Sequence, residues 1–274
     1  INKTAFDEAG IDVPPPDWNW DNFADVAKAL TRKAGDEYEF FGCSIWQSNF
    51  PLQFAAMYQN GGALMNEEGT EITITRPESV EAVQWWADLF LNGDVSVTAE
   101  AGADANDQDL FVAQRVGMIH ASSGFMDSLN RRLADQPFEW GLLLEPGRVT
   151  QDQWGATNYA SVFSASEHQE EAFQAMSFWA SPEAQIIMAN NGLIHAPVRY
   201  GAYRDYMKNL ASPPGVELHA NQWDMVVKIP WRAPFEEQLF KVYLPNITEV
   251  WNGNRTAQEV FEEIEPQMNA LFEA

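Results

Sequence analysis

The chain has 274 residues, of which 46% are apolar and 13% aromatic, so it can bury a sizeable core and does not have the composition of a disordered chain. Its 40 acidic and 16 basic side chains give a formal net charge of -24. Such a surface repels phosphates and anionic lipid headgroups, so neither nucleic acid nor a membrane surface is expected as a partner. Cys43 is the only cysteine, which excludes an intrachain disulfide. No apolar run approaches the roughly 18 residues of a membrane span.

Periodicity and capping residues predict short strands that alternate with helices, which is typical of α/β layering. The first helix is expected to follow Asn19 as its N-cap and to close at Gly35, with an apolar face of Phe23, Val26, Ala27 and Leu30. Further helices are expected over residues 52–59, from Pro77 to Asn92-Gly93, over 107–114, along Phe125, Leu129 and Leu133, from a Ser166/Gln169 capping box to Ala180, from Ser181-Pro182 to Asn191-Gly192, over 235–252 with an interruption at Pro245, and over 256–272 with a Thr256/Glu259 capping box. The expected strands are residues 39–45, 72–75, 116–120, 138–144 and 159–165.

Several phrases of the sequence resemble the extracellular solute-binding proteins of sugar ABC transporters, the group that includes the maltose-binding protein. They are residues 2–10 (NKTAFDEAG), 20–23 (WDNF), 30–31 (LT), 60–65 (NGGALM), 72–82 (ITITRPESVEA), 111–118 (FVAQRVGM) and 181–185 (SPEAQ). Each phrase alone is a weak signal, but their order and spacing along the whole chain make a strong joint one. One departure is Gln114-Arg115, which stands where the family usually has Gly-Lys.

The resemblance implies an α/β, periplasmic-binding-protein-like fold of type II, in which two lobes joined by a hinge hold a sugar between them. The family's first lobe has no counterpart in most of this sequence. By analogy, residues 1–160 form the first part of the second lobe, residues 161–195 contain a hinge crossing and helices of the first lobe, and residues 196–274 return to the second lobe. Without the rest of the first lobe, the helices of 161–195 lose much of their packing partner.

A sugar offers polar edges, which suit amides and guanidinium groups, and an apolar face, which suits aromatic rings. Four candidates, Trp46, Gln47, Asn49 and Phe50, follow the expected strand 39–45, at the end of a strand where clefts of α/β sheets open. Their alternative role is to cover the core as ordinary loop residues. Three further tryptophans lie on apolar helix faces and are expected to be structural: Trp86, Trp179 and Trp251.

The resemblance adds three further pairs of candidate ligand contacts. Gly124 and Phe125 stand at a strand-to-helix turn that often contributes an aromatic ring, Asn158 and Tyr159 precede a hinge crossing, and Trp231 and Arg232 match a late loop that faces the cleft. Phe125 could instead be core, Tyr159 could pack the hinge, and Arg232 could form a surface salt bridge.

Catalytic and metal sites find less support. Forty carboxylates make chance Asp/Glu pairs certain, so a glycosidase dyad is not excluded by counting. However, no G-x-S-x-G elbow is present, and the four histidines, His120, His168, His195 and His219, have no metal-ligand spacing. Residues 104–109 also fail the EF-hand template. No catalytic residue, cofactor or metal is therefore expected.

The leading hypothesis is a non-enzymatic, monomeric binding protein that captures a carbohydrate by hinge closure and delivers it to the permease subunits of an ABC importer. Two alternatives are a carbohydrate-active hydrolase that uses an Asp/Glu pair and a binding protein for another solute, such as a polyamine. The chain starts INKTAFDEAG without an initiator Met, so its beginning is expected to have been removed and the lack of a signal peptide is uninformative. The resemblance implies a periplasmic or extracellular location, with an anchor through a missing N-terminus as one possibility.

Overall fold

The computed structural model describes residues 1–35, 37–44, 50–91, 95–96, 106–121, 126–135, 138–155, 160–191, 196–209, 213–227, 229 and 234–273. The chain divides into two compact units. Unit 1 contains residues 1–120, 144–154 and 225–274, and unit 2 contains residues 121–143 and 155–224. The chain therefore leaves unit 1 after His120, returns at Leu144, leaves again after Trp154 and returns at Met225.

Unit 1 has a three-stranded sheet in the order β1-β2-β3. β1 (Arg32–Ala34) pairs antiparallel with β2 (Glu37–Ser44), and β2 pairs parallel with β3 (Val116–Ile119), with Cys43 opposite Met118. The predicted strands 39–45 and 116–120 are thus confirmed over their described residues. Gly35 lies in the β1–β2 turn with φ 65°, so it does not close the first helix, which ends at Leu30 and is capped by Thr31.

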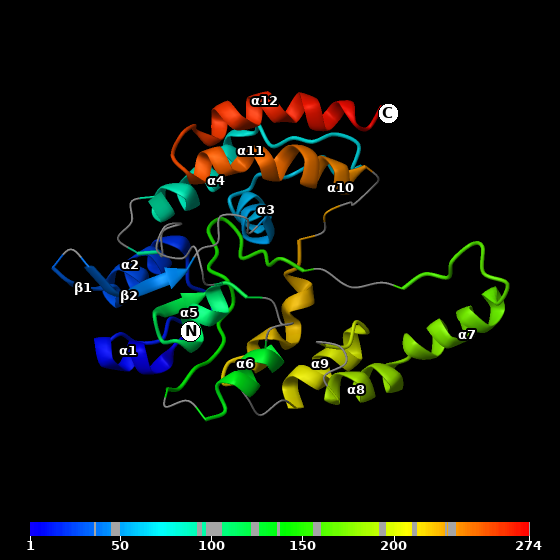
Figure 1. The fold of residues 1–274 in the computed structure, drawn as a ribbon, viewed down its shortest axis with the longest axis horizontal. Coiled ribbons are helices and arrows are strands. Elements are labelled where there is room, and N and C mark those ends of the chain that lie inside the picture. The colour runs from blue at the N-terminus through cyan, green and yellow to red at the C-terminus, as the bar shows by residue number, and fades with distance from the viewer. Residues whose placement is uncertain are drawn as a thin grey trace. The chain divides into compact units, whose positions relative to one another are not determined.

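Helix α2 (Trp20–Leu30) packs against β2 and β3 (Figure 1). Helix α1 (Lys3–Ala9) contacts α2 and β3, and α5 (Asp107–Val112) contacts β3. The predicted Asn19 cap is present, because its side chain accepts a hydrogen bond from the backbone N–H of Asn22 at 2.9 Å. The approach of α2 to β2 is very close at Gly42, where a Cβ atom would lie 1.8 Å from the backbone oxygen of Ala27. Glycine is therefore required at that point of the strand.

A helical layer completes unit 1 (Figure 1). It contains α3 (Phe50–Gln59), α4 (Pro77–Leu91), α10 (Phe235–Glu237), the π-helical stretch η3 (Gln238–Tyr243), α11 (Leu244–Trp251) and α12 (Ala257–Ala270), and α4 packs against α3, α11 and α12. Trp86 and Trp251 are fully buried here, as predicted. Pro245 does not interrupt the helical run over residues 235–251; it lies at the start of α11, directly after the π-helical stretch η3, and such a local change of helix type can accommodate a proline.

The predicted strand 72–75 is wrong. Ile72 forms one isolated bridge with Met65, and the following residues turn. Side chains of α12 take the place of a neighbouring strand: the N–H of Ile72 donates to Asn269 Oδ1 at 2.7 Å, and the N–H of Thr75 donates to Glu265 Oε2 at 2.7 Å. Apolar and polar residues alternate in this stretch because Ile72 and Ile74 are buried, and not because the stretch pairs with a neighbouring strand.

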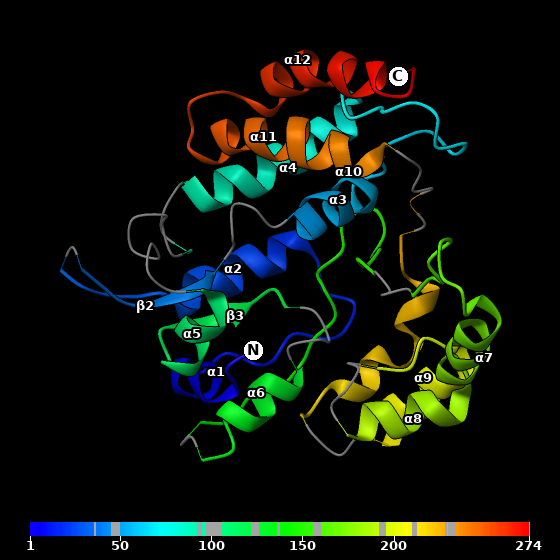
Figure 2. The same ribbon diagram turned by 45° about the vertical axis from the view of Figure 1, so that its right-hand side comes forward.

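Unit 2 is helical in its described part and contains α6 (Met126–Arg132), α7 (Gln169–Trp179), α8 (Pro182–Asn190), α9 (Tyr200–Asn209) and the 3-10 helix η2 (Val216–Asp224). Helix α9 packs against α8 and η2 (Figure 2). The core of this unit is small, and its buried members are Met126, Ala189, Tyr203, Tyr206, Met207, Val216 and Ala220. The predicted strands 138–144 and 159–165 are not strands over their described residues; Leu142 instead donates its N–H to Pro214 O at 2.8 Å.

Helix α7 ends at its C-cap Ala180, as predicted, but differs from expectation in its N-terminal cap and in its exposure. It begins after His168 and has no side-chain cap, because the Ser166 hydroxyl accepts from His168 N and Gln169 donates to Ser164 O, so the predicted capping box does not form. None of its residues is buried, and Trp179, predicted to be structural, is 46% exposed. The Ser181 cap of α8 and the Thr256/Glu259 capping box of α12 are both confirmed.

Candidate functional site

The carboxyl ends of β2 and β3 form the edge where a ligand site of an α/β sheet is expected. Ser44 ends β2, and His120 directly follows β3. Because these strands run parallel with Ser44 opposite Ile119, both residues lie at the same edge. Ser44 Oγ lies 2.5 Å from Asp107 Oδ1, at the start of α5, and His120 Nε2 lies 2.5 Å from Glu145 Oε1.

The charges at this edge are largely removed from water. Burial raises the pKa of the Asp107 carboxyl, and the Ser44 hydroxyl and the charge of His120 oppose that shift only in part. For His120, burial lowers the pKa, but the hydrogen bond and charge of Glu145, together with the charge of Asp107, outweigh it, so the pKa lies above the ordinary value of 6.5. The His120 and Glu145 side chains are 20% and 17% exposed. The edge therefore favours an imidazolium paired with a carboxylate.

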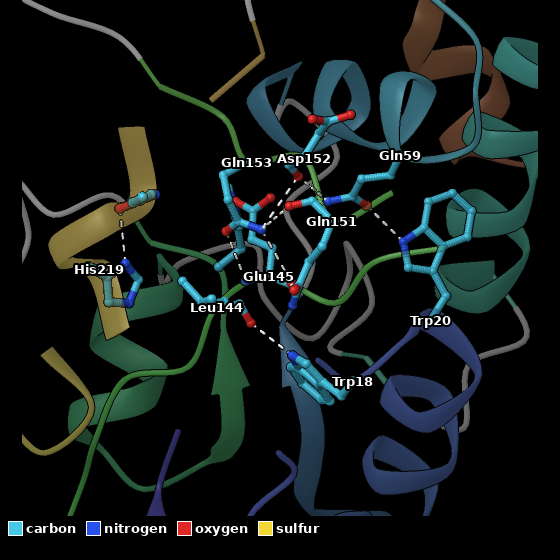
Figure 3. Close-up of polar contacts among 11 residues, drawn as sticks. Trp18, Trp20, Gln59, Leu144, Glu145, Gln151, Asp152, Gln153 and His219 are labelled. Atoms are coloured by element: carbon cyan, nitrogen blue, oxygen red, sulfur yellow. Dashed lines mark hydrogen bonds and ion pairs between the residues drawn. The ribbon is translucent and has the colours of Figure 1, made fainter. Parts of the chain in front are cut away.

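Residues 144–154 run across unit 1 beside this edge and are held at their beginning by Trp18 and the backbone. The indole N–H of Trp18 donates to Leu144 O at 2.8 Å (Figure 3). Gly147 donates its N–H to Trp18 O at 3.0 Å and accepts from Trp20 N at 3.0 Å. The segment is thereby fixed to the entry of α2.

Glutamine side chains hold the remainder of the segment. Gln59 accepts from the Trp20 indole at 2.8 Å and donates to Asp152 O at 2.6 Å, so it lies between the two (Figure 3). Gln153 accepts from Glu145 N at 3.0 Å through its side chain, and Gln151 donates to Glu145 O at 3.0 Å. With its backbone fixed in this way, Glu145 presents its carboxylate to His120.

An aromatic cluster lies at the far end of this segment. The ring of Trp154 contacts Phe50 with centroids 5.8 Å apart, edge to face, and contacts Phe54 at 6.0 Å. Phe54 is fully buried, whereas Phe50 and Trp154 are half-buried. Partly exposed rings beside an amide-rich segment can stack on an apolar face while the amides bind hydroxyls.

Of the predicted ligand contacts, Phe50 is described and begins α3, where it joins this cluster. The others lie outside the described residues and remain predictions: Trp46, Gln47, Asn49, Gly124, Phe125, Asn158, Tyr159, Trp231 and Arg232. Most of these residues are close in sequence to described parts of the site. Residues 45–49 come directly after β2, residues 122–125 come just after His120, and residues 156–159 come just after Trp154.

Sequence reasoning missed Trp154, His120 and Glu145 as members of the site. Trp154 carried a signal, because it lies four residues before the candidate Asn158. His120 also carried one, since it is the last residue of a predicted strand. Glu145 had no such signal: it is one of 40 acidic residues, and only the fold brings it to His120.

The described residues contain no group of three or more His, Cys, Asp or Glu side chains arranged to hold a metal ion. The thiol of Cys43 is buried, and burial raises its pKa, so it is held as a neutral thiol. Over the described ranges no helix is both long and apolar enough to cross a membrane.

Two curated relatives match part of the chain. A protein of Brucella abortus (strain 2308) and one of Brucella suis biovar 1 (strain 1330), each described as a binding protein, are 25% identical over 181 residues. The match covers 65% of this chain and 42% of each relative, so the chain corresponds to less than half of their length.

Solved structures match nearly the whole chain. The ABC substrate-binding protein of Listeria monocytogenes in complex with cycloalternan has a TM-score of 0.82 at 24% identity and matches over 98% of this chain and 67% of its own. The GacH receptor of Streptomyces glaucescens has a TM-score of 0.78 at 19% identity, over 99% and 68%. The cyclic maltosyl-maltose binding protein of Arthrobacter globiformis has a TM-score of 0.74 at 22% identity, over 99% and 68%.

These matches confirm the predicted fold, that of the two-lobed periplasmic-binding proteins, of which the chain spans about two-thirds. Residues 1–186 match the family described as bacterial extracellular solute-binding protein, which covers well over half of the chain. The chain belongs to this family of extracellular solute-binding proteins.

Proposed function

We propose that this chain is part of the substrate-binding component of an ABC import system, which captures a carbohydrate between two lobes by hinge closure and delivers it to a membrane permease. The observation that carries the proposal is the pair of half-buried rings, Phe50 and Trp154, that borders an amide-rich segment at the sheet edge. Three solved structures of the same fold support it, since one is a complex with cycloalternan, one is a cyclic maltosyl-maltose binding protein and one is a receptor solved in complex with acarbose.

The ligand contacts are proposed to be the residues predicted from the sequence, with Trp154 added. Phe50 and Trp154 stack on the sugar ring, together with Trp46, Phe125, Tyr159 and Trp231, while Gln47, Asn49, Asn158, Arg232 and the backbone of Gly124 bind its hydroxyls. Binding is non-catalytic, because the mechanism requires only contacts that are stronger in the closed arrangement of the lobes than in the open one. The protein acts as an extracellular or periplasmic monomer.

We also propose that residues 161–195 belong to the first lobe. The support is the surface of α7 and α8: Phe173, Phe178, Trp179 and Ile187 are each at least 46% exposed, and an open groove of about 340 Å³ between the helices is lined by Ala175, Met176, Phe178, Trp179, Ala184, Ile187 and Met188. Apolar faces of this kind are normally covered. In the relatives, about a third of the chain lies outside the match and can supply such a cover.

A thermal-shift screen with maltose, acarbose, cycloalternan and spermidine tests the function. One sugar class is expected to raise the melting temperature, since a ligand at 100 times its Kd adds about 2.7 kcal/mol to the free energy of unfolding. Chromatography of the sugar after incubation is expected to show it unchanged. Stabilisation by spermidine alone would support a polyamine-binding protein, and hydrolysed sugar would support an enzyme; either result contradicts the proposal.

A further inference from the structure

His120 and Glu145 lie at two successive crossings between the units. His120 is the last residue of unit 1 before the chain enters unit 2, and Glu145 is the second residue after the chain returns. Within unit 1 their side chains meet, with 2.5 Å between His120 Nε2 and Glu145 Oε1. We call these two residues the crossing pair, since their bond joins two points that are 25 residues apart in sequence.

The Glu145 carboxylate depends on His120 for its hydrogen bonding. Its backbone N–H donates to Gln153 Oε1 at 3.0 Å and its carbonyl accepts from Gln151 at 3.0 Å, so these bonds join Glu145 to the rest of the segment and not to β3 (Figure 3). The second carboxylate oxygen, Oε2, is buried and has no partner among the described residues. A buried carboxylate with few partners is costly, so loss of the positive charge of His120 would weaken the pair even where the neutral imidazole keeps its hydrogen on Nε2.

The titratable groups whose charges act on His120 are acidic. Glu145 and Asp107 both favour its protonated form, while burial opposes it. The neighbouring Cys43 adds no charge, because burial raises the pKa of its thiol. The amides of Gln151 and Gln153 do not titrate, so His120 is the group of this cluster that changes charge near neutral pH.

We propose that the crossing pair is a protonation-dependent positioning element, which anchors Glu145 to the end of β3 while His120 is protonated and holds it more weakly when it is not. Because residues 144–154 lead from Glu145 to Trp154 and the next crossing, the weaker anchor also loosens the ring proposed to contact solute. That last consequence, and it alone, rests on the proposed function.

The direction of the pH effect follows from the raised pKa of His120. A group with a higher pKa in the folded than in the unfolded state stabilises the fold fully below its unfolded value of about 6.5. The stabilisation is lost as pH rises through the folded value. Each unit by which the pKa is raised corresponds to a tenfold preference of the proton for the folded chain.

The test needs no ligand, so it is independent of the proposed function. The melting temperature of the full chain is measured between pH 5.5 and 9 for the wild type, His120→Gln, Glu145→Gln and His168→Gln. His168 is an exposed histidine without a side-chain cap bond, so its variant is the matched control. The wild type and His168→Gln are expected to lose stability with the same slope as pH rises from about 6.5, and both crossing-pair variants to lose that slope.

Two measurements address the mechanism directly. Titration of the His120 imidazole by NMR in the wild type is expected to give a pKa above 6.5, and Glu145→Gln to lower it. Hydrogen exchange of the Glu145, Gly147 and Gln153 amides, measured relative to His168→Gln at each pH, is expected to speed up in His120→Gln at low pH. Should His120→Gln not fold, the NMR titration and Glu145→Gln still decide. An unchanged pH slope in both variants, or a His120 pKa at or below 6.5, would overturn the proposal.

Discussion

Phe50 and Trp154 meet edge to face, with ring centroids 5.8 Å apart, although 104 residues of sequence separate them. Phe50 begins α3, and Trp154 is the last residue before the chain crosses into unit 2. The fully buried ring of Phe54 contacts both. The buried ring of Phe54 restricts the movement of the two partly exposed rings that pack on it, Phe50 and Trp154. The three rings together form an aromatic surface, the platform, on which a sugar can stack.

Trp154→Ala is expected to weaken binding of whichever sugar the screen identifies by about 10- to 100-fold, since a ring contact is worth about 1–3 kcal/mol. Isothermal titration calorimetry measures the affinity. Phe240→Ala is the control, because Phe240 is an aromatic residue of the same unit that is 59% exposed and makes no ring contact with this cluster. Equal affinities of the two variants would remove Trp154 from the site.

Asn269→Ala is expected to lower the free energy of unfolding by about 1–3 kcal/mol, because it leaves the N–H and carbonyl of Ile72 without the bonds they make to α12. Urea denaturation measures the change. Gln258→Ala on the same helix serves as the control, since Gln258 is exposed and bonds only Glu262. If both variants unfold at the same urea concentration, the contact to Ile72 contributes little.

Gln114→Gly is expected to stabilise the chain by up to about 1 kcal/mol, because Gln114 has φ 56°, in the left-handed region that glycine adopts without steric cost. The adjacent Ala113→Gly is the matched control: its φ is -75°, so glycine there only adds flexibility and should destabilise by about 0.5–1 kcal/mol. Differential scanning calorimetry of both variants checks the sign of each.

Gly42→Ala is expected to destabilise unit 1 by about 3 kcal/mol or more, because the new Cβ would lie 1.8 Å from Ala27 O and push α2 off the sheet. Gly201→Ala, in α9, meets nothing within 4 Å and should be neutral or slightly stabilising. The fraction of soluble, cooperatively unfolding protein compares the two variants. A stable Gly42→Ala protein would mean that α2 can move away from β2 at little cost.

The sequence predicted those helix ends at which a side chain of the local sequence caps the helix. Asn19, Ser181 and Thr256 cap helices as predicted, because each supplies its own hydrogen-bond acceptor to a nearby N–H. The same reasoning failed at Ser166, where the hydroxyl bonds His168 in a tight turn before the helix begins. Helix α9 was missed although Tyr203, Tyr206 and Met207 have helical spacing and are buried.

Long-range contacts were beyond such signals. Residues 72–75 have the alternation of a strand, but α12, almost 200 residues later, supplies the bonds that a strand would. The crossing pair of His120 and Glu145 likewise forms only because the chain returns to unit 1 at Leu144, and no local sequence pattern predicts that return. Of the predicted site, Phe50 can be placed against other residues, and the platform it forms involves Trp154, which was not predicted.

The discontinuous course of unit 1 has a consequence for folding kinetics. Asn269 bonds Ile72 across 197 residues, and α4 packs against both α11 and α12, so the helical layer of unit 1 cannot be completed before α12 has been synthesised. High contact order of this kind slows folding, since loop closure must precede the contacts that reward it. Until α12 has been made, a nascent chain would therefore leave the part of α4 that α12 covers exposed to solvent.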